Sequence, residues 1–276
     1  MTTLVIGARG SIGREVLRLL LAAGEPVRAS VRNRAFADLP AGVPVVAADL
    51  TRPETLPAAL DGVKKVFLYC PPEGVEGFAK AAQDAGVDHV VLLSSGSVLL
   101  PYAAGNAIAE EHRLVEQALA GSGLRWTPIR PLVLANNALS WGHSIRADSV
   151  VRLLHPEAAM APVHERDVAA VAVAGLDGVD DVSGVLTGPE PMTQRHQVEL
   201  IAQAVGRPIH IEELSAEEGR IHFSRFMPPD AADAVVDLVT AALNGGSPAT
   251  TTAQRVLGRV PLPFAQWARD HAADFR

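Results

Sequence analysis

The chain of 276 residues has little of several residue types on which protein function often depends. Its one cysteine, Cys70, excludes an internal disulfide, and no spacing of Cys and His residues resembles a structural zinc site, so we expect no metal. No apolar run reaches the roughly 18–20 residues that a membrane-spanning helix needs. The sequence also lacks a basic stretch before its first strand-like segment, which a secretory signal would require. We therefore expect a cytoplasmic protein.

Positive charge is scarce as well. The 24 Lys and Arg residues are outnumbered by 31 Asp and Glu residues, which gives a formal net charge of −7 without a basic cluster. A nucleic-acid-binding protein usually shows a basic face. The expected partner is therefore a small-molecule substrate, with no nucleic acid and no membrane, and the expected state is a monomer or homodimer. Lys80 is the last of three lysines, and Tyr69 and Tyr102 are the two tyrosines, so counting excludes a Tyr–Lys pair late in the chain.

The first 131 residues alternate between segments with the period of a strand and segments with the period of a helix. The expected strands are Thr3–Ile6, Val27–Val31, Val43–Ala47, Val66–Cys70, His89–Leu93 and Trp126–Ile129. The expected helices between them are Ser11–Ala23, Pro53–Leu60, Val75–Ala85 and Ala107–Ala120. This alternation predicts an α/β fold with a Rossmann-type doubly wound parallel sheet.

After residue 131 the strict alternation fades. The expected strands there are Met160–His164, Val185–Thr187 and Pro208–Leu214, and the expected helices are Val168–Leu176, Gln197–Val205 and Ala231–Leu243. Asp167 is expected to be the N-cap of the first of these helices. We expect residues 1–135 to form an NADP-binding core. Residues 136–276 should form a small C-terminal α/β substrate cap, with a part, about 159–188, returning to the core.

A glycine-rich turn connects the first strand to the first helix. It reads Gly7-Ala8-Arg9-Gly10-Ser11-Ile12-Gly13, which is G-x-x-G-x-x-G spacing. Glycines let the backbone turn tightly and approach a pyrophosphate, and the helix N-terminus offers unpaired N–H donors to it. The turn therefore predicts cofactor contacts from Gly7, Arg9, Gly10, Ser11, Ile12 and Gly13.

The residue after the second strand indicates which dinucleotide is bound. An unphosphorylated ribose calls for an acidic residue there, whereas this chain has Arg32 and no carboxylate from Ala29 to Ala37. A guanidinium forms bidentate hydrogen bonds with phosphate, and Arg9 adds a second positive charge. The sequence thus favours NADP(H) over NAD(H).

Other strands of the expected sheet end in residues suited to line the same cleft, because ligands of open α/β sheets bind beyond the carboxyl ends of the strands. Asp49 and Leu50 follow the third strand, where Asp49 either contacts the adenine or caps the following turn. Tyr69 and Cys70 end the fourth strand, and Ser94 and Ser95 follow the fifth.

Several of these motifs together resemble a known family. They are the glycine turn, Arg32, Ser94-Ser95 and the segments SGLRWTPIRP at 122–131, PVHERDVA at 162–169, LTGPE at 186–190 and PFAQWAR at 263–269. The chain is similar to the NmrA-like group of atypical short-chain dehydrogenases/reductases, and to the bacterial branch that resembles ergot-alkaloid festuclavine/agroclavine synthases. The resemblance implies the Rossmann fold, NADP(H), and a backbone contact from Pro131 to the cofactor carboxamide.

The chain departs from the usual Tyr-x-x-x-Lys pair of such reductases. With the helix aligned through Glu116, Ile108 stands at the tyrosine position and His112 at the lysine position. His112 is a catalytic candidate, as an acid or as a group that orients the nicotinamide ribose; the alternative is an exposed helix histidine. Tyr102 is a second candidate, as a proton donor or a substrate contact, against plain loop packing.

Three residues are expected to contact the substrate: Asn137, Trp141 and His164. Trp141 can stack on a planar ring. The leading hypothesis is an NADPH-dependent reductase of a small, cyclic secondary metabolite, with an iminium, enone or ketone as hydride acceptor. The alternatives are a non-catalytic NADP-binding regulator or redox sensor, and a redox-neutral tailoring enzyme, such as a cyclase, in a former reductase pocket.

Overall fold

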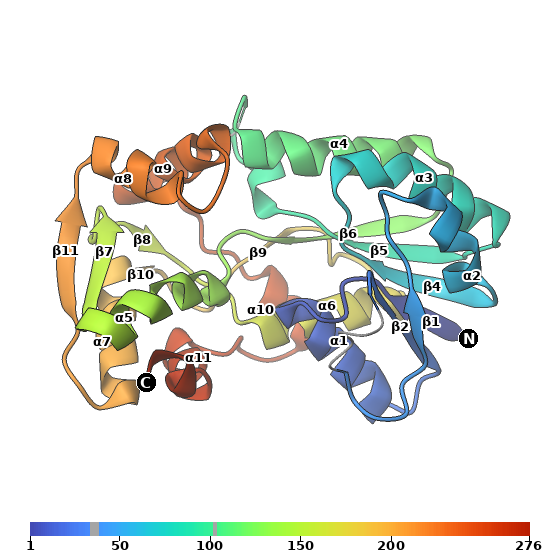
Figure 1. Ribbon diagram of the computed structural model, residues 1–276, viewed down its shortest axis with the longest axis horizontal. Helices are drawn as coiled ribbons and strands as arrows, with labels where there is room; N and C mark the ends of the chain where they lie inside the picture. Colours follow the sequence, from blue (N-terminus) through green and yellow to red (C-terminus); the bar gives the residue numbers. More distant parts are fainter. Residues whose placement is uncertain (34–38, 102–103) are drawn as a thin grey trace. The chain divides into compact units, whose positions relative to one another are not determined.

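The computed structural model describes residues 1–33, 39–101 and 104–276 (Figure 1). The chain forms two compact units, each built from several segments. Unit 1 comprises residues 1–104, 109–131 and 165–185, and unit 2 comprises residues 105–108, 132–164 and 186–276.

Unit 1 is built on a seven-stranded sheet with the order β3-β2-β1-β4-β5-β6-β9. Neighbouring strands from β3 through β6 pair in parallel, and the order reverses between β1 and β4. This confirms the Rossmann-type sheet. The strands are β1 (Thr2–Val5), β2 (Val27–Val31), β3 (Val45–Ala47), β4 (Val63–Leu68), β5 (His89–Leu93), β6 (Trp126–Pro131) and β9 (Val185–Leu186).

Helices cover both faces of this sheet, as Figure 1 shows. One face packs against α2 (Leu56–Leu60), α3 (Pro72–Asp84) and α4 (Ala107–Gly121), which share a buried core with Leu4, Val66 and Val90. The other face carries α1 (Ser11–Ala22) and α6 (Glu165–Leu176), which pack against each other. Side chains along a strand alternate between the two faces, so the apolar runs of the sequence supply buried residues to both layers. Burial of each large apolar side chain stabilises the fold by about 1.5–3 kcal/mol.

Unit 2 contains two small sheets and a set of helices. β7 (Val150–Leu154) pairs in parallel with β11 (His210–Leu214), and β8 (Ala159–Met160) pairs antiparallel with β10 (Met192–Thr193). The helices are η5 (Ala135–Trp141), α5 (Gly142–Asp148), α7 (Gln194–Val205), α8 (Ala216–Phe223), α9 (Pro229–Leu243), α10 (Thr252–Leu257), α11 (Phe264–Asp270) and η6 (Ala272–Phe275). Its core centres on the fully buried Trp267, which stacks on Phe264 with ring centroids 5.0 Å apart.

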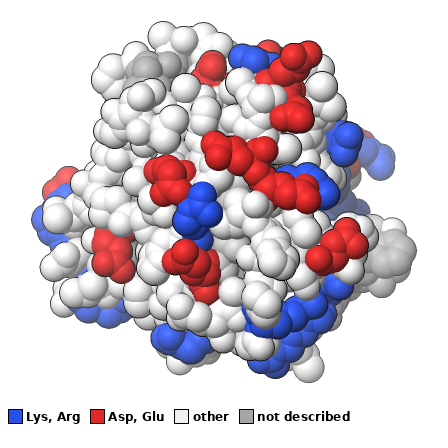
Figure 2. Space-filling view, turned by 90° about the vertical axis from the view of Figure 1, so that its left-hand side faces the viewer, with Lys and Arg blue, Asp and Glu red and all other residues white. Residues whose placement is uncertain are grey.

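Acidic and basic side chains mix on the outer surface of unit 2. Arg152 of β7 lies 2.8 Å from Glu212 of β11, and Arg195 of α7 lies 2.6 Å from Glu157. Figure 2 shows the two signs alternating across the centre of the face it presents. Exposed pairs of this kind each contribute about 0–1 kcal/mol to stability, so they do little to hold the fold together.

Some expected boundaries are wrong. β4 ends at Leu68, so Tyr69 and Cys70 lie beyond the strand rather than within it. The helix expected from Val168 begins at Glu165, which places the buried Asp167 in its first turn and not at the N-cap. The strand expected over 160–164 shrinks to Ala159–Met160, because only these residues pair with β10. Strand β7 was not foreseen, since its partner β11 lies about sixty residues away in sequence.

None of the helices within the described ranges is long and apolar enough to cross a bilayer.

Candidate functional site

The glycine turn of unit 1 has the geometry of a phosphate cradle. Gly7 has φ +80°, a left-handed conformation that side-chain-bearing residues avoid, and its carbonyl accepts the Gly10 N–H at 2.9 Å. A Cβ on Gly13 would lie 2.2 Å from the Gly7 carbonyl oxygen. Only glycine at position 13 therefore allows α1 to pack this closely against the turn.

The first turn of α1 offers its N–H groups to a ligand. Gly10 is the N-cap, and no side chain accepts a hydrogen bond there. Gly7, Arg9, Gly10 and Ser11 are exposed, whereas Ile12 is buried beneath them. Free N–H donors with a partial positive charge at a helix N-terminus bind phosphate. The cradle therefore fits the pyrophosphate of a dinucleotide.

Several other expected residues gather at the same edge of the sheet, because the parallel strands all end there. The topological switch point lies between β1 and β4, the strands that precede Gly7 and Tyr69. The two residues are adjacent: a Cβ on Gly7 would lie 3.7 Å from the Tyr69 Cβ. The Tyr69 side chain is 55% exposed, so its ring is open to a ligand beside the turn.

Arg32 and Asp49 follow neighbouring strands and act on each other electrostatically. Arg32 is exposed directly after β2. The hydroxyl and backbone N–H of Thr51 donate to Asp49 Oδ1 at 2.8 and 3.0 Å. These hydrogen bonds, aided by the positive charges of Arg32 and Arg52, lower the pKa of Asp49. Asp49 thus organises the turn after β3, which is one of the two roles foreseen for it, while the exposed Arg32 guanidinium suits a phosphate.

Two of the residues predicted to contact the cofactor have side chains that pack into the protein. Leu50 is half-buried, and a Cβ on Gly74 of α3 would come within 2.8 Å of its Cβ. Cys70 is buried with its Sγ 3.2 Å from the Pro71 carbonyl oxygen. Burial, together with the charge of Glu73, raises the pKa of the Cys70 thiol to about 12. The thiol is therefore protonated and unreactive, so a cofactor contact at Cys70 would come from its backbone.

A buried ion pair lies under the end of β5. The Ser94 hydroxyl donates to Glu116 Oε1 at 2.6 Å. Arg130 of β6 donates to both carboxylate oxygens of Glu116, at 2.8 and 2.6 Å, and to the Ser183 carbonyl at 2.8 Å. This network was not predicted, because Glu116 served only as an alignment point. The charged Arg130 inside an apolar strand is the feature of the sequence that indicates it. Ser94 is 3% exposed, so its side chain serves the network.

The neighbouring Ser95 and Pro131 are placed differently. The Ser95 hydroxyl lies 2.8 Å from the Ser97 hydroxyl and accepts the Ser97 N–H, which caps the 3-10 helix η3 (Gly96–Leu99). Pro131 is the last residue of β6 and is buried. Both residues therefore lie at the carboxyl edge, where their backbones can face a ligand.

Of the two catalytic candidates, one lies among the described residues. His112 is half-buried on α4, one helical turn before Glu116. Burial lowers the pKa of His112, and the nearby Glu116 charge opposes this in part. The ring is therefore neutral at pH 7, which favours a role in hydrogen bonding over one as an acid. Tyr102 lies outside the described residues.

Two of the substrate candidates lie on η5 of unit 2. Asn137 is exposed; its backbone N–H donates to the Leu134 carbonyl, and its carbonyl accepts the Ser140 hydroxyl at 2.7 Å. Trp141 is half-buried and packs against the core around Trp267. Asn137 is thus free to meet a ligand through its side chain, whereas Trp141 also has a structural role.

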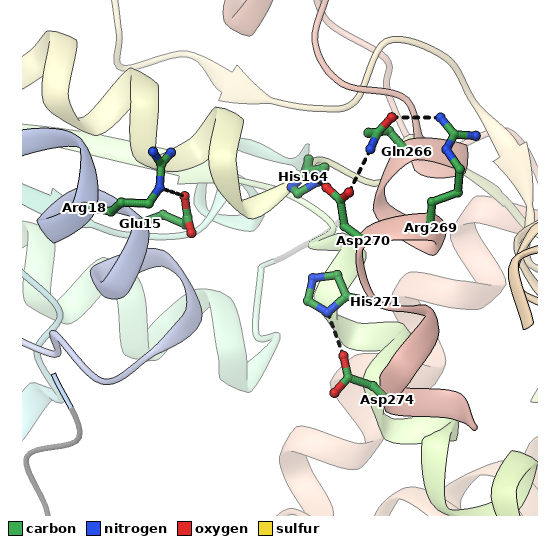
Figure 3. A network of polar contacts seen from close by, with 8 residues as sticks. All are labelled: Glu15, Arg18, His164, Gln266, Arg269, Asp270, His271 and Asp274. Atoms are coloured by element: carbon green, nitrogen blue, oxygen red, sulfur yellow. Dashed lines mark hydrogen bonds and ion pairs between the residues drawn. The ribbon is translucent and has the colours of Figure 1, made fainter. Parts of the chain in front are cut away.

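The third substrate candidate, His164, belongs to a chain of polar contacts with α11 (Figure 3). His164 is 1% exposed, and its Nε2 lies 3.4 Å from Asp270 Oδ2. Asp270 Oδ1 accepts from Gln266 Nε2 at 2.7 Å, and Gln266 Oε1 accepts from Arg269 at 2.8 Å. The imidazole therefore ties the segment after β8 to the C-terminal helix.

In the ranges that the structure describes, no group of three or more His, Cys, Asp or Glu side chains is arranged to hold a metal ion.

These features define a dinucleotide-binding protein of the Rossmann class, and comparisons with known proteins agree. A family model described as NAD(P)H-binding matches residues 7–178. The chain is 38% identical over 279 residues to (4-alkanoyl-5-oxo-2,5-dihydrofuran-3-yl)methyl phosphate reductase of Streptomyces griseus, covering 99% of this chain and 98% of the relative. It is 34% identical over 288 residues to NAD(P)H azoreductase of Xenophilus azovorans, with the same coverage.

Solved structures give the same picture. An NADPH-dependent quinone oxidoreductase of Escherichia coli superposes with a TM-score of 0.80 and 25% identity, covering 98% of this chain and 99% of that one. Among the relatives found by sequence, agroclavine dehydrogenase of Claviceps fusiformis is 26% identical over 225 residues, covering 77% of this chain and 76% of the relative.

The chain belongs to the NAD(P)H-binding family, and the expected likeness to the NmrA-like atypical reductases is confirmed. It is an NAD(P)H-dependent oxidoreductase, which confirms that part of the leading hypothesis.

Proposed function

We propose that this protein is an NADPH-dependent reductase of a small, planar, conjugated acceptor, such as an enone within a ring, a quinone or an iminium. The observation that carries the proposal is the missing Tyr–Lys pair. The chain has no lysine after Lys80, and α4 presents Ile108 and His112 where related reductases have a tyrosine and a lysine.

Electrostatics around His112 support this choice of acceptor. Because burial lowers the pKa of His112, the ring is neutral at pH 7 and carries no imidazolium proton to donate. Reduction of a simple ketone, which needs a proton at oxygen as hydride arrives, therefore has poor support from this residue. A conjugated acceptor spreads the incoming charge over several atoms, and an iminium carbon already carries the charge that hydride neutralises. Such acceptors need precise positioning more than an acid.

The names of the relatives fit the same class. The substrate name of the Streptomyces griseus enzyme describes a dihydrofuranone ring that also bears an alkanoyl group, and the E. coli neighbour is named for quinones. We extend to this chain the feature that these substrates have in common, an unsaturated bond conjugated with carbonyl groups.

Within the chain, each part of unit 1 has a defined task. The glycine turn and the first N–H groups of α1 would hold the pyrophosphate, and Arg32 would hold the 2′-phosphate that distinguishes NADPH from NADH. When bound, the cofactor supplies the hydride. The Ser94–Glu116–Arg130 network holds β5, β6 and α4 together, which fixes the His112 ring relative to the carboxyl edge.

The experiment is an acceptor series with the full chain and NADPH, followed at 340 nm. A 3-acyl-2(5H)-furanone, 2-methyl-1,4-naphthoquinone and a cyclic iminium are compared with cyclohexanone, a simple ketone of similar size. We expect at least one conjugated acceptor to have a kcat/KM at least about 100-fold above that of cyclohexanone.

Equal rates with cyclohexanone would contradict the proposed acceptor class. NADPH that binds but is oxidised by none of the conjugated acceptors would contradict it as well. NADH in place of NADPH serves as the control for the role assigned to Arg32.

A further inference from the structure

An exposed aromatic ring lies next to the glycine turn of unit 1. Tyr69 is 55% exposed, whereas its neighbours Leu68 and Cys70 are buried. Side chains that follow one another along an extended segment point in opposite directions, so the Tyr69 ring points away from the core that holds the other two. Solvent reaches this ring in the folded chain, and a ligand of unit 1 can reach it as well.

Tyr69 differs in this respect from the other aromatic residues of its unit. Within the described part of unit 1, Phe67 and Phe78 are buried, and Trp126 packs against the core. A large ring is more stable inside a protein than in water. Single exposed apolar residues are nevertheless common on protein surfaces, so it is the position of Tyr69, together with its exposure, that points to a ligand.

The pairing of two strands fixes that position. Val5 of β1 lies opposite Phe67 of β4, and the Ile6 N–H donates to the Phe67 carbonyl at 2.9 Å. Two residues further along each strand, Gly7 and Tyr69 are adjacent, since a Cβ placed on Gly7 would lie 3.7 Å from the Tyr69 Cβ. Tyr69 therefore stands at the side of the phosphate cradle, at the switch point between β1 and β4.

The layout of the carboxyl edge indicates which part of a dinucleotide meets this ring. In the proposed function Arg32, which follows β2, holds the 2′-phosphate, so the adenosine lies over the strands on that side of β1. The pyrophosphate lies at the glycine turn, which follows β1 itself. A dinucleotide crosses the sheet at the switch point, so its nicotinamide half extends from the turn over β4, the strand that Tyr69 follows.

We propose that Tyr69 positions the nicotinamide half of the dinucleotide, with its ring packed against that half. The inference rests on the proposed function, which assigns the adenosine half to the side of Arg32. An aromatic face offers a flat, apolar contact to a planar ring or to the ribose that carries it, and the hydroxyl group is not needed for this contact. The contact restricts the nicotinamide, whose hydride has to be aimed at the acceptor.

The test is calorimetric titration of the full chain with three ligands of increasing length. 2′,5′-ADP contains the adenosine and the 2′-phosphate, 2′-phospho-ADP-ribose adds the second phosphate and the ribose, and NADP+ adds the nicotinamide ring. Tyr69→Leu removes the aromatic face, and Tyr69→Phe keeps the face while it removes the hydroxyl. Because the side chain is exposed, we expect both variants to melt within a few degrees of the wild type.

We expect Tyr69→Leu to bind NADP+ at least about tenfold more weakly and to bind 2′,5′-ADP with unchanged affinity. Tyr69→Phe should bind all three ligands within about twofold of the wild type. The intermediate ligand shows which group the ring meets. A loss for 2′-phospho-ADP-ribose assigns the contact to the ribose phosphate, and unchanged affinity assigns it to the nicotinamide ring.

Unchanged NADP+ affinity in Tyr69→Leu would overturn the inference. An equal loss for 2′,5′-ADP would do the same, since that ligand ends before the nicotinamide half. A Tyr69→Phe variant that loses as much as Tyr69→Leu would show that the hydroxyl, and not the ring, makes the contact.

The matched control is Leu114→Ala, which removes another exposed apolar side chain of unit 1, on α4, and should leave all three affinities unchanged. An equal loss in this control would also contradict the role of Tyr69. The acceptor series and titration of Arg32→Ala test the proposed function with Tyr69 intact, so failure of the proposed function and failure of this inference are seen separately.

Discussion

The two units treat buried polar side chains differently. In unit 1, Ser94, Glu116 and Arg130 satisfy one another in a closed network. In unit 2, the described residues include four side chains with buried polar atoms that have no hydrogen-bond partner, namely Asn136, Gln197, Ser247 and Trp267. In the described part of unit 1 such an atom is found only at Oε2 of Glu165, a residue that interacts through other atoms.

The difference follows from how each unit would meet a ligand. In the proposed function the glycine turn of unit 1 would bind through backbone N–H groups, so the side chains of that unit can pair among themselves and stiffen the sheet. A protein that recognises a ligand through side chains has to leave polar atoms unpaired until the ligand arrives, at a cost of roughly 1–3 kcal/mol for each buried group. Stability of the fold thus favours buried polar groups that are paired with each other, whereas recognition of a ligand requires some that are unpaired.

The largest expected effect breaks the network of unit 1. Arg130→Leu leaves the mostly buried Glu116 carboxylate without its cation, and we expect a loss of about 3–5 kcal/mol in the free energy of unfolding. Urea denaturation measures it. The matched control is Glu212→Gln in unit 2, which breaks the exposed pair with Arg152 and should cost less than about 1 kcal/mol. Equal losses in the two variants would erase the contrast between the units.

A second prediction tests the backbone cradle. Gly13→Ala forces a Cβ against the Gly7 carbonyl oxygen, and such overpacking costs about 1–3 kcal/mol. We expect NADPH affinity to fall about 30-fold, measured by calorimetry. Gly121→Ala at the end of α4 is the control, because its Cβ would meet no atom within 4 Å. A Gly13→Ala protein with wild-type affinity would show that the turn does not approach the pyrophosphate.

A third prediction concerns charge at the same edge. Arg32→Ala removes the exposed guanidinium after β2 and should weaken NADPH binding about tenfold, with little effect on NADH. Titration with both cofactors checks this. A similar loss for NADH would mean that Arg32 acts through the turn around Asp49, whose carboxylate its charge influences, rather than through the 2′-phosphate.

The smallest expected effect is a dependence on pH. Because burial lowers the pKa of His112, the unfolded chain takes up a proton first as the pH falls below about 6.5. The contribution to stability is complete above that pH and is lost as the pH falls through the lower pKa of the folded state. His89 in the same unit has the same sign of shift, caused first by burial.

Unfolding free energies of the wild type and His112→Gln between pH 5 and 8 test this prediction. The variant should lose less stability on acidification than the wild type. Identical slopes would show that His112 is solvated in the folded protein and that its neutral state at pH 7 owes nothing to burial.

Much of unit 1 could be predicted from the sequence, because the signals are local. Alternating strand and helix periods gave the parallel sheet, and three glycines between a strand and a helix gave the cradle. The C-terminal half was harder: β7 finds its partner β11 only after the chain returns, and the helix at Glu165 begins earlier than Asp167 suggested.

The sequence by itself determined the fold class, the dinucleotide cradle and the absence of a Tyr–Lys pair, since backbone needs and residue counts are readable without tertiary contacts. Only the tertiary structure decided which polar groups are paired. Ser94 meets Glu116 across 22 residues, and His164 meets Asp270 across 106. Asn136 rather than Asn137 is shielded. Burial and pairing depend on packing between distant segments, and two adjacent asparagines look alike until that packing places one inside and the other in water.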